Sequence, residues 1–287
     1  MFELQIVTNS DKSKSAELIL RKHLDREDQP THILILTALD GGDPFKSGTT
    51  QILINVGDAN DNIPCFDQLV YNIKLLENVP KGTTVLTLNA TDIDEGSNGE
   101  VTYYFNKLVP TSVREIFTIE HHTGVLTVIG EVNFEDSKVY EIAIEALDRG
   151  ILPVAAHCKV VIEIIDFNDN APEIIVSSLS SSLQEDAKPG TVVALIKISD
   201  KDSGDNGKIS CSLPTWLPFT LQNTYNNHYS LTLKEPLDRE TTQEYNIPIT
   251  ASDYGSPSLS TSIVVTVHVS DVNDNRPNSP NHLTRSV

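Results

Sequence analysis

The chain has 287 residues and carries a formal charge of −19, with 40 Asp and Glu against 21 Lys and Arg. Nucleic-acid binding is disfavoured because phosphate contacts need clustered cations. A hydrophobic content of 39% argues against intrinsic disorder. No apolar run approaches the roughly 20 residues that span a bilayer, and no signal-peptide pattern follows Met1. The three cysteines have no CxxC spacing, which argues against a disulfide framework or a zinc site.

Residues 1–63 are predicted to form an incomplete repeat that consists of C-terminal strands only. Apolar residues alternate with polar ones, the period-two pattern of a half-buried strand. They fall in two runs: Leu34, Leu36 and Ala38, then Ile52, Ile54 and Val56. Because the chain starts late, we expect the early strands of this repeat to be missing.

Residues 64–171 and 172–275 are predicted to be two complete repeats, followed by a tail at 276–287. Both contain alternating apolar runs bounded by Gly, Pro, Asn and Asp. The runs are Ile142, Ile144 and Ala146; Val160, Ile162 and Ile164; Ile247, Ile249 and Ala251; and Ile263, Val265, Val267 and Val269. Helical periodicity of useful length is absent. We therefore predict an all-β chain of tandem sandwiches.

Acidic motifs recur along the chain in one register. D-x-N-D-N begins at three positions, 108 and 105 residues apart: Asp58, Asp166 and Asp271. A-x-D-x-G places aspartates at the same spacings: Asp40, Asp148 and Asp253. Two further pairs of matching elements lie 108 residues apart: Glu77 and Glu185, and D-x-D with N-G at Asp92–Gly99 and Asp200–Gly207. So many shared positions indicate tandem domains of one kind.

We expect these acidic residues to gather where consecutive repeats meet. At the first junction they are Asp25, Glu27, Asp58, Asp61, Asp92, Asp94 and Asp148, with Asn60 and Asn98. At the second they are Glu77, Glu135, Asp166, Asp169, Asp200, Asp202 and Asp253, with Asn168 and Asn206. A third half-junction contains Glu185, Asp238, Glu240, Asp271 and Asp274.

A divalent cation is the simplest way to hold so many carboxylates together. Two like charges about 4 Å apart repel by roughly 4 kcal/mol at an effective dielectric near 20. Calcium takes six to eight oxygen ligands in irregular geometry, whereas magnesium needs a tighter octahedron and zinc prefers nitrogen or sulfur. The motifs therefore predict calcium sites.

Two other readings of these residues deserve comparison. Asp, Asn and Gly are ordinary turn formers at the ends of strands, so a single motif is weak evidence for metal. Paired carboxylates also occur in glycosidases, which need one unique pair in a cleft. Recurrence in every repeat favours the metal over both alternatives, and the chain is predicted not to be an enzyme.

The motifs resemble those of the cadherin superfamily. They are L-D-R-E at Leu24–Glu27 and Leu237–Glu240, A-x-D-x-G, D-x-D with N-G, and D-x-N-D-N. The stretches Asn89–Gly99, Cys211–Pro214 and Leu217–Phe219 look most like a clustered protocadherin ectodomain fragment. The resemblance implies Greek-key cadherin repeats in a calcium-rigidified rod.

The resemblance also implies three calcium ions per junction. At the second junction, Glu77, Glu135 and Asp169 would line the outer two sites, and Asp166, the Phe167 carbonyl and Asp202 would complete one of them. The third site would use Asn168, Asp200, Asp202, Asp253 and the carbonyls of Asn170 and Asn206. The first junction maps in the same way through Asp25, Glu27, Asp58, Asn60, Asp61, Asn62, Asp92, Asp94, Asn98 and Asp148.

This sequence departs from the expected pattern at two places. Asn133 stands where Asp25 and Asp238 stand in the other repeats, so the outermost site of the second junction should be weaker. The first junction lacks its incoming glutamate because the chain starts too late.

By the same resemblance, the parent protein would act in calcium-dependent adhesion and recognition on the extracellular side of the plasma membrane. Its partner would be the same protein on an apposed cell, and membrane attachment would come from segments outside this chain. The alternative is a passive, calcium-stiffened spacer without a recognition role. The sequon at Asn89 leaves glycosylation open.

Overall fold

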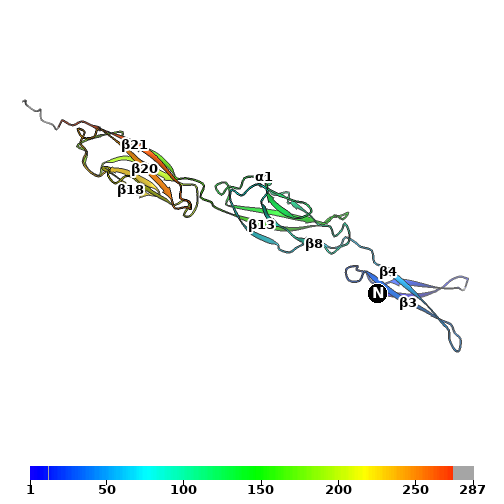
Figure 1. Ribbon diagram of the computed structural model, residues 1–287. Coiled ribbons are helices and arrows are strands. Elements are labelled where there is room, and N and C mark those ends of the chain that lie inside the picture. The colour runs from blue at the N-terminus through cyan, green and yellow to red at the C-terminus, as the bar shows by residue number, and fades with distance from the viewer. Residues whose placement is uncertain (12, 274–287) are drawn as a thin grey trace, which may run out of the picture. The chain divides into compact units, whose positions relative to one another are not determined.

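The computed structural model describes residues 1–11 and 13–273 (Figure 1). The chain divides into two units. Unit 1 comprises Met1–Leu75, Val79–Val132 and Val139–Glu163, and unit 2 comprises Leu76–Asn78, Asn133–Lys138 and the chain from Ile164 onward. The predicted all-β class is confirmed: the described residues contain one short helix, α1 (Thr111–Ile116), too short for helical periodicity to announce it.

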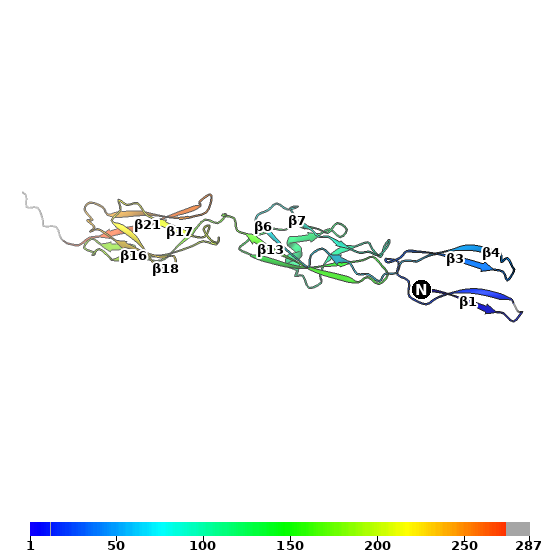
Figure 2. The same cartoon turned by 90° about the horizontal axis from the view of Figure 1, so that it is seen from below.

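The N-terminal part of unit 1 consists of two antiparallel hairpins, visible as separate ribbons in Figure 2. They are β1 (Phe2–Thr8) with β2 (Lys14–Leu20), and β3 (Thr31–Leu39) with β4 (Ser47–Asn55). The rings of Phe2 and His32 meet edge to face at 5.4 Å, so the hairpins touch. Ile33 and Ile35 on β3 remain 60% and 74% exposed, which indicates a thin core here.

The middle repeat is a β-sandwich within residues 65–165. Its strands are β5 (Cys65–Phe66), β6 (Val70–Leu76), β7 (Thr84–Thr87), β8 (Ala90–Thr91), β9 (Thr102–Phe105), β10 (Phe117–Ile119), β11 (Val125–Val128), β12 (Val139–Leu147) and β13 (Ala155–Ile165). One sheet has the order β6-β13-β12-β9, and β10-β11-β7 forms another. The Phe117 and Tyr140 rings join the two sheets at 5.2 Å.

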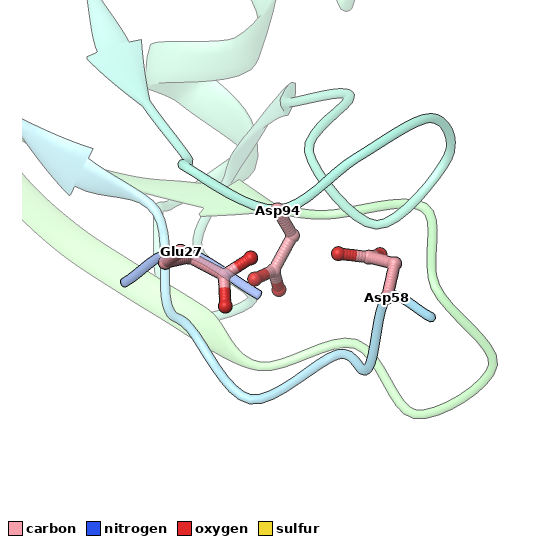
Figure 3. A group of neighbouring side chains, drawn as sticks. All are labelled: Glu27, Asp58 and Asp94. Carbon is pink, nitrogen blue, oxygen red and sulfur yellow. The ribbon is translucent and has the colours of Figure 1, made fainter. Parts of the chain in front are cut away.

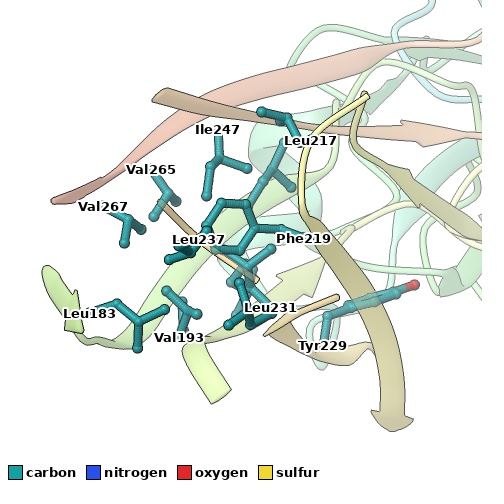
Figure 4. Close-up of a cluster of buried hydrophobic side chains, with 14 of the residues drawn as sticks. Leu183, Val193, Leu217, Phe219, Tyr229, Leu231, Leu237, Ile247, Val265 and Val267 are labelled. Atoms are coloured by element: carbon teal, nitrogen blue, oxygen red, sulfur yellow. The ribbon is translucent and has the colours of Figure 1, made fainter. Parts of the chain in front are cut away.

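The last repeat is a second sandwich, in unit 2. Its strands are β14 (Glu173–Leu179), β15 (Ser182–Gln184), β16 (Val192–Ser199), β17 (Ile209–Ser212), β18 (Phe219–Tyr225), β19 (His228–Leu233), β20 (Glu244–Asp253) and β21 (Ser260–Ser270). They form sheets of order β14-β16-β19-β18 and β15-β21-β20-β17. Figure 4 shows the core, where Phe219 packs among Leu217, Leu231 and Ile247.

The predicted inward-facing positions are confirmed in both complete repeats. Ile142, Ile144 and Ala146 are fully buried, as are Ile247 and Ile249 of the next repeat. The polar motifs that follow these apolar runs lie at the ends of the strands. No helix among the described residues is long and apolar enough to cross a bilayer.

Candidate metal centre

Oxygen atoms of acidic side chains converge at three places in the described chain, each where strands end. We call the group of Glu27, Asp58 and Asp94 the unit-1 cluster (Figure 3). The unit-2 cluster combines two overlapping groups: Glu77, Glu135 and Asp166, and Glu135, Asp169 and Asp202. The third cluster is Glu185, Asp238 and Glu240. Within each group, one oxygen per residue lies within 4.8 Å of the others.

The carboxylates of the unit-1 cluster face one another across a short gap in Figure 3. Asp94 is buried and accepts the Asn62 side-chain amide at 2.7 Å. The backbone N–H of Asp94 donates to Asp92 Oδ1 at 3.0 Å, which holds the D-x-D loop. Asp58 accepts the Asn98 amide at 2.8 Å. Linker and loop are thus joined through predicted ligand residues.

Asp148 and Asn60 form a second predicted part of the first junction. The buried Asp148 carboxylate accepts the backbone N–H groups of Gly150 and Val154 at 2.8 and 3.1 Å. It also accepts the Asn60 amide at 3.3 Å. Asp148 is therefore held by its own loop, with the central asparagine of D-x-N-D-N beside it.

Asp25 and Asp61 do not belong to the three-carboxylate group of the first junction within the described chain. Asp25 Oδ1 accepts the backbone N–H of Asp28 at 3.1 Å, and Asp61 accepts the Asn62 amide at 3.0 Å. Both carboxylates make local hydrogen bonds in this structure, and their role as ligands stays a prediction.

In the unit-2 cluster, Glu77 is buried and accepts two backbone N–H groups. Phe134 donates at 2.8 Å and Phe167 at 2.5 Å. Glu185 repeats this arrangement in the third cluster, where Arg239 and Val272 donate at 2.9 and 2.7 Å. These hydrogen bonds fix one carboxylate at the base of each cluster.

The D-x-N-D-N linker of the second junction is tied to its surroundings by amides. The Asn170 amide donates to Asp169 and Asp202 at 2.7 Å each, and to Glu135 at 3.2 Å. The Asn168 amide donates to Asp253 at 3.1 Å. The sequence assigned Asn170 only through its carbonyl, so the bridging role of its amide was missed.

Burial and neighbouring charge raise the pKa of two unit-2 carboxyl groups. For Glu135, burial is the main cause, followed by the charges of Glu77, Asp169 and Asp202. Burial likewise raises the pKa of Asp200, with repulsion from Asp202 and Asp253. These carboxylates are ionised less readily than usual when no cation is nearby.

Asp58 behaves differently from these two residues. Although burial opposes ionisation, hydrogen bonds from Asn98, the Glu95 backbone N–H and Arg26 outweigh it and lower the pKa of Asp58. The Arg26 guanidinium, which the sequence did not single out, donates to Asp58 Oδ1 at 2.6 Å. The signal available was its place inside L-D-R-E, between two predicted ligands.

Several buried oxygens at these junctions have no hydrogen-bond partner. They are Glu27 Oε1, Asn60 Oδ1, Asp92 Oδ2, Asp166 Oδ1, Asn168 Oδ1 and Asp200 Oδ2. Glu27 Oε1 makes only an ion-pair contact with Arg26. A buried polar atom without a partner costs roughly 1–3 kcal/mol, and more if it is charged. A hard cation with oxygen ligands would satisfy all six, so the residues present fit calcium.

Two glycines lie where no larger side chain would fit beside the predicted ligands. A Cβ atom at Gly207 would lie 2.1 Å from the Asp202 carbonyl oxygen, and one at Gly255 would lie 2.2 Å from Asn168 Cγ. Glycine in N-G and in A-x-D-x-G therefore leaves room for the ligand-bearing loop and for the central asparagine of the linker.

The remaining predicted residues lie near these clusters or outside the described chain. Asn206 donates its amide to Asp166 Oδ2 at 2.8 Å, and Asp271 pairs with Arg239 at 3.2 Å. Asn133 Oδ1 accepts the Glu135 backbone N–H at 2.7 Å, a turn-forming role. Asp274 lies outside the described residues.

Comparison with known proteins identifies the relatives of this chain. A family profile described as Cadherin domain matches residues 71–165 and 179–270. Human protocadherin alpha-5 is 49% identical over 276 residues, which are 96% of this chain and 30% of that protein. Protocadherin gamma-C3 of Pan troglodytes is 50% identical over 278 residues, 97% of this chain and 30% of that protein. The chain thus spans less than a third of either relative.

Solved structures agree with the fold. The structure of "Protocadherin Gamma B2 extracellular cadherin domains 1-5" superposes with a TM-score of 0.91 at 47% identity, covering 96% of this chain and 52% of that one. Mouse cadherin-23 EC22-24 gives a TM-score of 0.76 at 26% identity, covering 94% of this chain and 82% of that one.

Proposed function

The chain belongs to the cadherin family, and we propose that it is a calcium-binding recognition segment of a clustered protocadherin ectodomain. The family consists of adhesion proteins rather than enzymes. The observation that carries the calcium proposal is the set of buried, unpartnered oxygens beside converging carboxylates. The structural neighbours are themselves extracellular cadherin domains.

Within unit 2, the chain's own residues suggest which oxygens would hold the metal. Glu77, Glu135 and Asp166 would share one ion, and Glu135, Asp169 and Asp202 another. Asn168, Asp200 and Asp253 would supply a third set, since Asn168 Oδ1 and Asp200 Oδ2 lack partners. The first junction would use Glu27, Asp58 and Asp94, with Asn60, Asp92 and Asp148.

The bound ion would supply positive charge that offsets the repulsion among these carboxylates. The linker at 166–170 would then be fixed to the loop that carries Asp200 and Asp202, because both contribute ligands. Without the ion, only asparagine amides and backbone N–H groups join them. We infer that calcium stiffens this segment of the chain.

Calorimetric titration tests the binding itself. Extracellular modules bind calcium at roughly 10⁻⁴–10⁻³ M, and we expect affinities of that order. The Asp202→Asn variant should lose at least one site, whereas Asp136→Asn, an exposed carboxylate outside the clusters, should not. Absence of calcium heat in the unsubstituted chain would refute the proposal.

Small-angle scattering tests the stiffening. Curves recorded with calcium and with chelator should differ for the unsubstituted chain, and this difference should shrink in Asp202→Ala. Identical curves under both conditions would leave calcium without a mechanical role.

Recognition is proposed for the parent protein, with a second copy on an apposed cell as the partner and the extracellular side of the plasma membrane as the location. Bead aggregation by the full ectodomain tests it. If this segment is a passive spacer, substitution of its outward strand residues, such as Leu195 or Val264, should leave the aggregation unchanged. A homophilic module predicts aggregation that requires calcium and is lost on these substitutions.

A further inference from the structure

Arg26 places a permanent positive charge inside the unit-1 cluster. Its Nε donates to Asp58 Oδ1 at 2.6 Å and its Nη2 donates to the Ile93 carbonyl at 3.0 Å. Nη2 also makes an ion pair with Glu27. The Arg26 side chain is only 16% exposed. A guanidinium stays charged at any relevant pH, so one positive charge is shared between two carboxylates of the cluster without metal.

The residue at the corresponding position differs between the repeats, and so does the environment of the first aspartate of D-x-N-D-N. Arg239 pairs with Asp271 at 3.2 Å, the same contact to the first aspartate of D-x-N-D-N. Phe134 occupies the position in the middle repeat, where its buried side chain has no charge to offer. There, Asp166 Oδ1 is buried without a partner. The first aspartate of D-x-N-D-N therefore keeps an unpartnered buried oxygen in the middle repeat, where no arginine is present.

The two linker aspartates otherwise accept the same kinds of donor, although both donors bind Oδ2 of Asp166 and are divided between Oδ1 and Oδ2 of Asp58. Asp58 and Asp166 each accept one loop N–H at 3.1 Å and one asparagine amide at 2.8 Å. The donors are Glu95 and Asn98 for Asp58, and Ser203 and Asn206 for Asp166. The difference in charge between the two sites is the cation that the chain contributes beside Asp58.

We propose that Arg26 is a built-in counter-cation that competes with calcium for Asp58 and Glu27. The inference rests on the proposed function, since it assumes that the cluster binds calcium. Before calcium can use these oxygens, the guanidinium must withdraw and its charge-assisted hydrogen bonds must break. Bonds of this strength correspond to about a tenfold change in affinity. Replacement of Arg26 by an uncharged residue should therefore increase the calcium affinity of the unit-1 cluster.

Backbone amide NMR during a calcium titration tests the proposal, because Gly99 and Gly207 follow the two D-x-D loops and report each cluster separately. In Arg26→Gln, we expect the midpoint of the Gly99 shift to fall by about tenfold while that of Gly207 stays constant. Arg26→Phe, which installs the middle-repeat residue, should give the same gain. Arg21→Gln is the matched control, since Arg21 pairs with Glu3 on an exposed surface.

A second readout separates competition from a structural role. In chelator, Arg26→Gln should lower the melting temperature of unit 1 because Asp58 and Glu27 lose their counter-charge; saturating calcium should remove this loss. An unchanged or increased Gly99 midpoint in both Arg26 variants would overturn the proposal. If calcium moves neither glycine in the unsubstituted chain, the proposed function fails, and this inference fails with it.

Discussion

Glu135 belongs to both groups of the unit-2 cluster. We therefore expect calcium to favour the ionised form of its carboxyl group. Its pKa in the folded chain lies above the ordinary value of 4.5, chiefly because of burial and then because of nearby carboxylates. Between these two pKa values the folded chain binds more protons than the unfolded chain. The contribution of Glu135 to stability therefore rises as pH falls through this window.

Glu135→Gln is expected to reverse its effect on stability when calcium is added. In chelator at pH 7, the variant should melt about 1–3 °C higher than the unsubstituted chain, and this advantage should shrink toward pH 4.5. In calcium it should melt lower, because a ligand is lost. Melting curves across pH measure both effects, with Glu141→Gln as an exposed control. A variant that melts lower in chelator at pH 7 would contradict the charge argument.

Asn133 is an amide at a position where the other two repeats carry a carboxylate, Asp25 and Asp238. Its Oδ1 accepts the Asp136 backbone N–H at 3.3 Å, as Asp238 Oδ1 accepts that of Thr241 at 3.1 Å. Asn133→Asp should therefore keep the turn while adding a charged ligand. We expect calcium affinity at the unit-2 cluster to increase by about three- to tenfold. Calorimetry measures the change, and unchanged affinity would remove this residue from the ligand set.

At the scale of elements, the A-x-D-x-G loop after β20 and the D-x-N-D-N linker after β13 depend on each other. Gly255 lies where a Cβ atom would come within 2.2 Å of Asn168 Cγ. Asn168 must then shift, which would break its hydrogen bonds to Asp253 and the Pro257 carbonyl.

Gly255→Ala is therefore expected to destabilise unit 2 by about 1–3 kcal/mol and to weaken calcium binding there. Chemical denaturation and calorimetry measure the two effects. Gly48→Ala is the control, because nothing lies within 4 Å of a Cβ atom at Gly48. If Gly255→Ala behaves like Gly48→Ala, the linker and the loop are not coupled.

Much of the fold could be predicted because strand periodicity depends on local sequence alone. The alternation that marked Ile142 and Ile247 as inward-facing holds in the structure. The repeated register also assigned Glu135, Asp169 and Asp202 to one junction, and their carboxylate oxygens converge in the structure.

The rest depends on side-chain rotamers and long-range packing, which spacing does not encode. Which carboxylate oxygen stays unpartnered is decided by amides such as that of Asn170, and by whether an arginine or Phe134 occupies the neighbouring position. For the same reason, spacing alone does not show that the Asp25 carboxylate accepts the Asp28 backbone N–H or that Asp61 accepts the Asn62 amide.

At the scale of the whole molecule, much of the negative charge comes from acidic motifs that recur with the repeats. About half of the acidic residues lie at the repeated junction positions, where several are buried, and the two complete repeats between them have apolar cores. A chain built in this way is stabilised wherever a cation offsets the charge. Its stability should therefore increase with calcium concentration.

Diffraction from crystals grown with millimolar calcium tests the central claim most directly. Anomalous difference maps should place ions between Glu135, Asp169 and Asp202, about 2.3–2.6 Å from their carboxylate oxygens. Peaks are also expected beside Asp166 Oδ1 and Asp200 Oδ2, which have no other partner. Maps without peaks at these positions, or with peaks only on exposed carboxylates elsewhere, would contradict the account.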